Sequence, residues 1–365
     1  MSRRMHCYTL IVNAPAPKGA GQVAYSFGHT RGILLRIGKG RGEVSATMRV
    51  KKTPDDILDG NGLFEDALKR LKLFHCLTYG SALKIERIYF AVDEEKPIQV
   101  GDDVAARHLP VALFDEERAP RLGKAQARRV MEAYLDKDGE KGFKHLRIAM
   151  DAWLMARSAG GENERLLCGW AAISGLYKYV DMLVCRAVEA HGEDTGRGTE
   201  CMRIQQLHSV LNGLIPHGGC TWNAQARISM ANAAKGLLGN SDLETADRAL
   251  LSGDGELPKS LGELMRKREA PDFFTPWSFL ALELGYVLRC DAIHANKPMI
   301  TYEAARNYEL RQLRMVNRLI EELLFETLPL WLGSEETRSE VESRAKKLWK
   351  ARVRYAKNGK DDGDE

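Results

Sequence analysis

Residues 163–188 repeat their apolar side chains with the period of an α-helix, and from Leu166 to Val184 they are apolar on nearly every side. A helix without a polar face must be covered by other elements all round, so it belongs in the middle of a helical bundle. No strand pattern follows residue 125. The sequence therefore predicts that the larger, C-terminal part of the chain is all-α and is built around this helix.

The other segments of this part also show helical periodicity. They cover residues 125–136, 142–156, 201–214, 224–238, 243–251, 261–267, 274–298, 301–328 and 336–356. Pro329 and Gly333 are expected to end the segment that begins at residue 301. We therefore place a helical domain at residues 125–333, followed at 334–365 by a basic helix and an acidic tail.

The first 115 residues follow a different pattern, with apolar residues alternating with polar or small ones as in β-strands. Strands are predicted near residues 8–12, 23–27, 32–37, 44–50, 83–92 and 98–100. A glycine-rich turn at 38–42 makes two of them a hairpin, and residues 63–79 are predicted to be helical. The fold class is thus an α+β N-terminal domain at residues 1–115, joined by a charged linker at 116–124 to the helical domain.

Composition favours a cytoplasmic protein without membrane contact. The longest nearly uninterrupted apolar run, residues 166–176, is far shorter than the roughly 20 residues that span a bilayer. Seven cysteines are scattered without a C-x-x-C pair, and no Cys/His cluster has metal-ligand spacing. The glycine-rich segments lack the spacing of a P-loop, so they are interpreted as turns. We expect neither a metal nor a cofactor.

Charge is unevenly distributed, although the net charge is only +4. Residues 1–52 contain ten Lys and Arg side chains against Glu43 alone, and residues 344–360 contain eight basic side chains and no acid. The common meaning of such a run is a solvated face. The alternative is a surface at each end of the chain that attracts phosphates.

Residues 274–298 are predicted to form one helix of about seven turns that stops at Pro298. A helical wheel places Arg289 and His294 roughly 140° apart and outside the apolar stripe. The stripe consists of Trp277, Leu280, Ala281, Leu284 and Leu288, and the face between Arg289 and His294 contains Tyr286, Cys290 and Ile293. The pattern predicts one contact with the helix's own bundle and a second with a partner or a cleft.

The segment Arg289-Cys-Asp-Ala-Ile-His294 resembles the motif of HEPN domains, in which an arginine and a histidine are separated by four to six residues. HEPN domains are all-α, and many are metal-independent ribonucleases of toxin–antitoxin, phage-defence and CRISPR systems. A β-rich N-terminal part before a larger helical part resembles the ApeA-like members in particular. Two positions depart from the pattern, because Cys290 and Ala295 stand where the family often has Asn and Gly.

The resemblance implies an endoribonuclease of phage defence or stress response that acts as an abortive-infection toxin. Arg289 would stabilise the charge that gathers on the reacting phosphate, and His294 would transfer a proton. In HEPN families two chains combine their motifs across a two-fold axis, so a homodimer is expected. The N-terminal domain would then act as sensor or regulator, with a regulatory partner or a phage-derived trigger. The alternative is a non-catalytic HEPN-like module that binds RNA or a partner protein.

Three neighbours of the motif are supporting candidates. Asp291 could orient a catalytic group, but a structural salt bridge is the commoner role for such a carboxylate. Asn296 could bond a phosphate oxygen or cap the helix, and Tyr286 is expected at the dimer face. For the motif itself, the structural alternative is that Arg289 pairs with a surface carboxylate while His294 caps the last turn.

Overall fold

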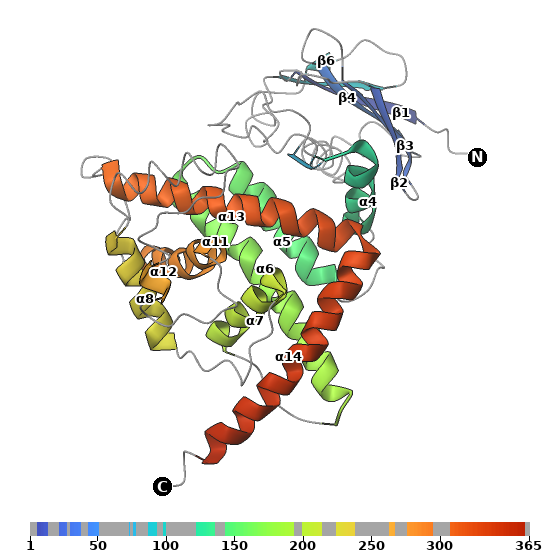
Figure 1. Cartoon of the computed structure of the whole chain (residues 1–365). Helices are drawn as coiled ribbons and strands as arrows, with labels where there is room; N and C mark the ends of the chain where they lie inside the picture. The colour runs from blue at the N-terminus through green and yellow to red at the C-terminus, as the bar shows by residue number, and fades with distance from the viewer. Residues whose placement is uncertain are drawn as a thin grey trace. The chain divides into compact units, whose positions relative to one another are not determined.

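The computed structural model describes residues 6–13, 22–27, 30–37, 43–50, 73, 76–77, 87–92, 98–99, 122–135, 143–192, 199–213, 224–237, 263–266, 276–294 and 307–361 (Figure 1). Packing divides the chain into two units, Met1–Asp138 with Arg157–Gly160 and Gly139–Ala156 with Gly161–Glu365. Helix α4 (Lys124–Leu135) packs on strand β2 (Gln22–Phe27) and belongs to the first unit, whereas the sequence analysis begins the helical domain with this segment. Most of the predicted linker lies outside the described residues.

The first unit contains a six-stranded antiparallel sheet in the order β2-β3-β4-β1-β5-β6. Its other strands are β1 (His6–Asn13), β3 (Thr30–Ile37), β4 (Glu43–Val50), β5 (Arg87–Val92) and β6 (Ile98–Gln99). The predicted hairpin is present, since β3 pairs with β4 and Ile37 lies opposite Val44. Most of the predicted helix at 63–79 lies outside the described residues, but Leu73, Cys76 and Leu77 are helical and buried.

The second unit is a helical bundle, as predicted. Its helices are α5 (Phe143–Arg157), α6 (Glu162–Glu189), α7 (Glu200–Asn212), α8 (Ala224–Leu237), α11 (Pro276–Phe279), η1 (Leu280–Leu284), α12 (Gly285–His294), α13 (Asn307–Gly333) and α14 (Glu335–Asp361). Residues 263–266 are also helical, and the predicted helix at 243–251 lies outside the described residues. The part of the chain described after residue 122 contains no strand.

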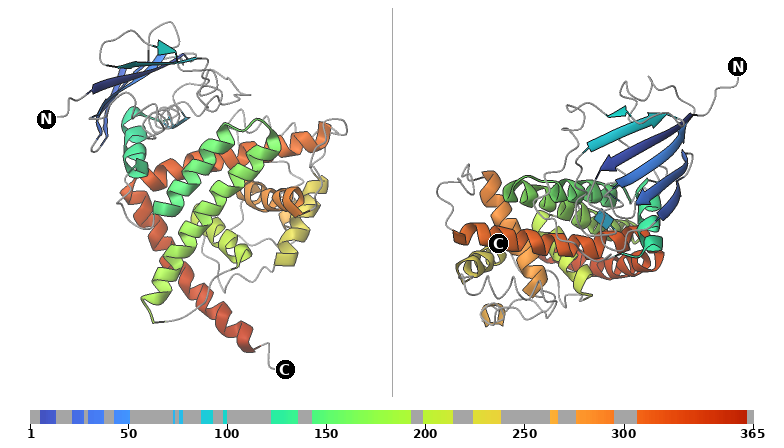
Figure 2. Two further views of the ribbon diagram at one scale, coloured as in Figure 1. Left: turned by 180° about the vertical axis from the view of Figure 1, so that it is seen from behind. Right: turned by 90° about the horizontal axis from the view of Figure 1, so that it is seen from above.

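Helix α6 occupies the middle of this bundle, with α13 and α14 packed across it (Figures 1 and 2). It also contacts α7 and α12, and its buried side chains point in every direction around its axis. Its approach to α5 is close, because a Cβ on Gly175 would lie 2.6 Å from the Cβ of Ala149 and 2.8 Å from the carbonyl oxygen of His145. The apolar circumference of residues 166–184 is therefore explained by neighbours on all sides.

Helix α13 does not end at Pro329, so that prediction was wrong. The helix continues to Gly333, with Pro329 buried inside its last turns. Near a helix end, proline removes a backbone hydrogen bond that is easily replaced from outside the helix. At the helix end itself, Nη1 of Arg338 donates to the terminal carbonyl oxygen of Leu332 at 2.7 Å, and the Trp331 ring packs 5.8 Å from the Tyr179 ring.

The predicted helix at 274–298 contains a π-helical segment. Residues 276–294 are helical throughout, but η1 has five residues with π geometry between two α-helical pieces. All of Ser278 to Gly285 is buried, so the helix is covered on almost every side rather than along one stripe. A π turn holds more residues than an α turn and rotates everything after it about the axis. After this segment, Leu288 of the predicted stripe is buried, and Ile293 of the predicted second face is exposed.

Candidate functional site

The π turn places one carboxylate, Glu283, in the interior of the bundle. Its side chain is 2% exposed and is held by Arg227 of α8, whose side chain is also 2% exposed. Nη2 of Arg227 donates to Oε1 at 2.6 Å and to Oε2 at 2.7 Å, and Nε donates to Oε2 at 3.1 Å. His208 of α7 lies 3.0 Å from Oε1 through its Nε2. We call the side chains of His208, Asn212, Arg227, Ser278 and Glu283 the buried polar cluster.

Hydrogen bonds in the buried polar cluster run in a single direction. A carboxylate only accepts, so Nε2 of His208 donates to Glu283 and Nδ1 is left as an acceptor. The Ser278 hydroxyl lies 3.0 Å from Nδ1 and therefore donates to it. Asn212 Nδ2 donates to the Ser278 oxygen at 3.1 Å. With a neutral His208, each of these bonds has one donor and one acceptor.

Electrostatics favour this arrangement. Burial lowers the pKa of His208 and outweighs the opposing effect of the Glu283 carboxylate, so the imidazole is neutral at pH 7. Burial alone would raise the pKa of Glu283, but the Arg227 charge and the His208 hydrogen bond hold it below its ordinary value. The pair is therefore Arg⁺ and Glu⁻, and both charges are fully satisfied inside the bundle. Because all of its members except the partly exposed Asn212 are buried, we assign the cluster the role of holding η1 against α7 and α8.

Arg289 lies one turn and a half beyond Glu283, on α12, and its environment is different. The side chain is partly exposed, and its Nη1 lies 3.9 Å from Sγ of Cys290. Within the part of the chain that the structure describes, no carboxylate lies in salt-bridge distance of its guanidinium. The surface pairing considered as the structural alternative is thus not present among these residues. Arg289 remains able to bind an anion.

A short chain of hydrogen bonds lies near Arg289. Ser174 Oγ lies 2.8 Å from the Tyr177 hydroxyl on α6, and that hydroxyl donates to Oε1 of Glu200 on α7 at 2.9 Å. Burial raises the pKa of Tyr177 to about 12; the Ser174 hydrogen bond and the Arg289 guanidinium oppose that rise, and the Glu200 charge adds to it. Arg289 and Glu200 therefore both act electrostatically on one hydroxyl group. The sequence analysis did not select Ser174, Tyr177 or Glu200.

Tyr286 and Asp291 have structural contacts within the bundle. The Tyr286 ring packs against the Trp170 ring of α6 with centroids 5.8 Å apart and is partly exposed, so its place at a dimer face stays a prediction. Asp291 accepts from Nζ of Lys235 on α8 at 3.1 Å in a partly exposed ion pair. Of the face predicted between Arg289 and His294, Ile293 is the exposed member at 45%.

The histidine of the motif is described by its backbone. His294 is the last residue of α12, so it stands at the helix C-terminus as predicted. Asn296 lies outside the described residues. The structure brings Arg289, Asp291, Tyr286 and the His294 backbone together on one helix, where the side chains of Arg289, Asp291 and Tyr286 are all partly exposed.

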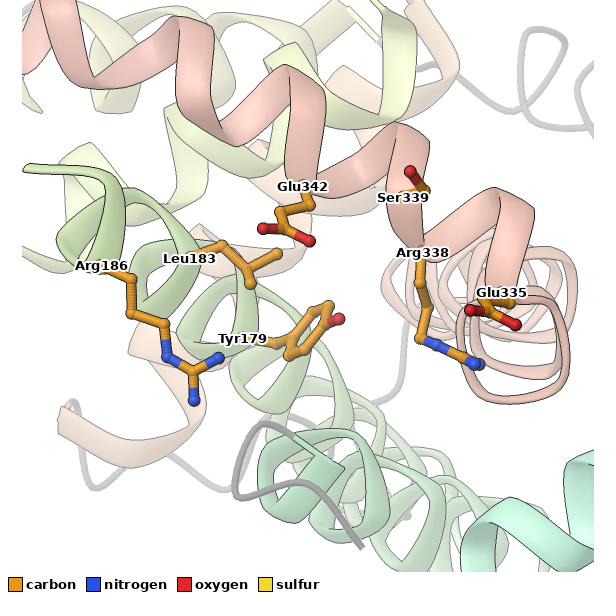
Figure 3. A pocket seen from close by; sticks show the side chains of 7 residues that line it. All are labelled: Tyr179, Leu183, Arg186, Glu335, Arg338, Ser339 and Glu342. Carbon is orange, nitrogen blue, oxygen red and sulfur yellow. The ribbon is translucent and has the colours of Figure 1, made fainter. Parts of the chain in front are cut away.

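A pocket of about 310 Å³ lies elsewhere in the second unit, between α6 and α14. Figure 3 shows Arg186 and Arg338 on opposite sides of it, with Tyr179 and Glu342 between them. Arg338 already donates to the Leu332 carbonyl, and Glu335 and Glu342 balance the two arginines. The lining therefore favours neither anions nor cations.

Comparison with protein-family models, with curated proteins and with solved structures finds no match to this chain. Within the described residues, no helix is long and apolar enough to cross a membrane. The same residues contain no group of three or more His, Cys, Asp or Glu side chains placed to hold a metal ion. The case for a function therefore depends on the chemistry around Arg289.

Proposed function

We propose that the protein is a metal-independent endoribonuclease of the HEPN type, with Arg289 and His294 in the active site. The observation that supports this most is the state of Arg289. It is the first residue of the motif, it is partly exposed, and no described carboxylate neutralises it. A structural arginine in a helical bundle is normally paired, as Arg227 is with Glu283.

The rigid support of Arg289 favours a catalytic role as well. A positively charged group stabilises a transition state most when it is held in place before the reaction. The segment that precedes α12 is anchored by the buried polar cluster, and Tyr286 fastens α12 itself to α6. Short π segments are frequent next to functional sites, where they change the direction of a helix. Here η1 ends five residues before Arg289.

The reaction would be attack of a ribose 2′-oxygen on the adjacent phosphorus. Negative charge gathers on the non-bridging oxygens, and the planar, permanently charged guanidinium of Arg289 can bind two of them. His294 would give a proton to the leaving 5′-oxygen, as an imidazole can near neutral pH. The products are a 2′,3′-cyclic phosphate and a 5′-hydroxyl. No step requires a metal ion.

We further propose that two chains assemble through the end of α12. Ile293 is 45% exposed beside the motif, and a two-fold axis near it would bring two Arg289 and two His294 residues to one phosphate. Residues 1–115 would then act as the regulatory part that responds to a partner or a phage-derived trigger. The protein would act in the cytoplasm as a toxin of antiviral defence.

The test is incubation of the purified full-length protein with total RNA in EDTA, followed by mapping of the cut ends. We expect cleavage that leaves 5′-hydroxyl ends and that His294→Ala abolishes. Cleavage that chelation abolishes and magnesium restores would contradict the mechanism. Binding of RNA without cleavage by the wild-type protein would instead support the non-catalytic module.

A further inference from the structure

We propose that Glu200 is a second catalytic group of the Arg289 site and accepts the proton of the attacking ribose 2′-hydroxyl. Tyr177 acts as a positioning residue that holds the Glu200 carboxylate in place. This inference rests on the proposed ribonuclease activity and adds to it the group that acts as base. It would leave His294 free to act as the acid within the same chain.

Helix packing places these residues on one side of the bundle. Helix α6 contacts both α7 and α12 (Figure 1). The Trp170–Tyr286 ring contact brings α6 and α12 together, and Ser174 and Tyr177 follow Trp170 one and two turns later on α6. Arg289 follows Tyr286 one turn later on α12, and its charge acts on the Tyr177 hydroxyl. Glu200 begins α7 directly opposite Tyr177, because their side chains are hydrogen bonded at 2.9 Å.

The state of the Glu200 carboxylate suits a base. Its Oε1 accepts the Tyr177 hydroxyl, and its Oε2 has no hydrogen-bond partner among the described residues. The side chain is partly exposed, so a substrate hydroxyl could reach Oε2. No described cation forms a salt bridge with it. By contrast Glu283, the carboxylate of the buried polar cluster, has both oxygens occupied and no access to solvent.

The hydrogen-bond chain fixes the direction of donation. Tyr177 remains protonated at neutral pH because burial and the Glu200 charge raise its pKa to about 12. Its hydroxyl must therefore donate to Glu200 and accept from Ser174. One carboxylate oxygen is thus held by Tyr177, while the other has no hydrogen-bond partner among the described residues. This is the arrangement expected of a positioned general base.

The step balances within the chain. The 2′-hydroxyl proton moves to Oε2 of Glu200 as the 2′-oxygen bonds to phosphorus. The bond between phosphorus and the 5′-oxygen breaks, and that oxygen takes a proton from His294. Glu200 then releases its proton to water and His294 takes one up, which restores both groups.

The experiment measures cleavage of RNA across pH by the full-length wild-type protein and by Glu200→Gln, Tyr177→Phe and Arg289→Ala. Glu189→Gln, which neutralises an exposed glutamate at the end of α6, is the matched control. We expect Glu200→Gln to lower kcat by about 10²- to 10⁴-fold and to remove the acidic limb of the pH profile, with little change in KM. Tyr177→Phe keeps the ring packing and should lower kcat by roughly tenfold while retaining that limb. Glu189→Gln should leave the profile unchanged.

The outcomes separate this inference from the proposed function. If Arg289→Ala abolishes cleavage while Glu200→Gln retains the wild-type rate and pH profile, Glu200 is not the base and the ribonuclease assignment stands. If the wild-type protein cuts no RNA, the ribonuclease assignment fails and this inference fails with it. Should Glu200→Gln not fold, Tyr177→Phe decides alone, and an unchanged kcat in that variant would overturn the proposal.

Discussion

Two arginines near the same helix have opposite environments. Arg227 is fully buried and bonded to both oxygens of Glu283, whereas Arg289 is partly exposed and lacks a carboxylate partner among the described residues. A buried charge is tolerated only when it is satisfied, so the first arrangement reports a structural role. A charge held on a rigid helix without a partner is available to a ligand. The comparison separates the η1 segment, whose Glu283 holds the fold together, from α12, whose Arg289 we assign to catalysis.

The largest effect on stability is expected from removing Glu283, the partner of the buried arginine Arg227. Glu283→Ala leaves Arg227 uncompensated in the interior and should lower the free energy of unfolding by about 3–5 kcal/mol. Asp291→Ala is the matched control, because it removes a partly exposed ion pair with Lys235 from the same helix and should cost only about 0–1 kcal/mol. Urea denaturation of both variants measures the difference. Equal losses would show that Glu283 is not an anchor.

A second pair of substitutions compares two residues of α12 beside the motif. Tyr286→Glu places a charge against the Trp170 ring and should lower the free energy of unfolding by roughly 2–4 kcal/mol. Ile293→Glu changes an exposed side chain, so stability should stay within about 0.5 kcal/mol while the proposed dimer dissociates. Denaturation and light scattering record the two effects. A Tyr286→Glu protein of wild-type stability would contradict a structural role for the contact between Tyr286 and Trp170.

The pH dependence of stability sharpens the account of the buried polar cluster. Burial holds the pKa of His208 in the folded protein below its value in the unfolded chain. As the pH falls, the unfolded chain therefore binds a proton at this histidine before the folded protein does. Stability should therefore fall as the pH drops below about 6.5, the ordinary histidine value. His208→Gln should flatten this slope. The same slope in wild type and His208→Gln would exclude a neutral buried imidazole.

The smallest effect concerns the basic surface of α14. Lys346 and Lys347 are exposed, and Lys346 forms only a surface ion pair with Glu342 at 3.0 Å. Changing both to Gln should weaken RNA binding severalfold and reduce its salt slope by up to about two, with kcat unchanged. The exposed Lys144→Gln on α5 serves as control. Unaltered affinity and salt slope would leave these residues as a solvated face. Lys350 and Arg354, also predicted to contribute, have side chains outside the described residues.

Sequence periodicity locates the helices of the second unit well, because their burial repeats with the helical period. The predicted helix at 163–188 corresponds to α6 at Glu162–Glu189. The π turn could not be predicted in this way, since one additional residue in a turn depends on packing rather than on local pattern. The one local signal was Glu283, a lone carboxylate in an apolar run, which needs a buried partner. Its partners Arg227 and His208 are 56 and 75 residues away along the chain.

The candidate site could be proposed from the sequence only in part. Spacing along one helix selects Arg289 and His294 without knowledge of the fold. Glu200 and Tyr177 lie on other helices and have no motif, so only the packing of α6, α7 and α12 shows their relation to Arg289.

The most direct test of the comparison is a measurement of RNA cleavage and unfolding on one preparation of Arg289→Ala. We predict that cleavage of total RNA is lost while the free energy of unfolding changes by less than about 0.5 kcal/mol, because the guanidinium has no described carboxylate partner to lose. Cleavage at the wild-type rate would contradict the assignment of Arg289 to the active site. A loss of several kcal/mol would show instead that Arg289 is a structural residue like Arg227.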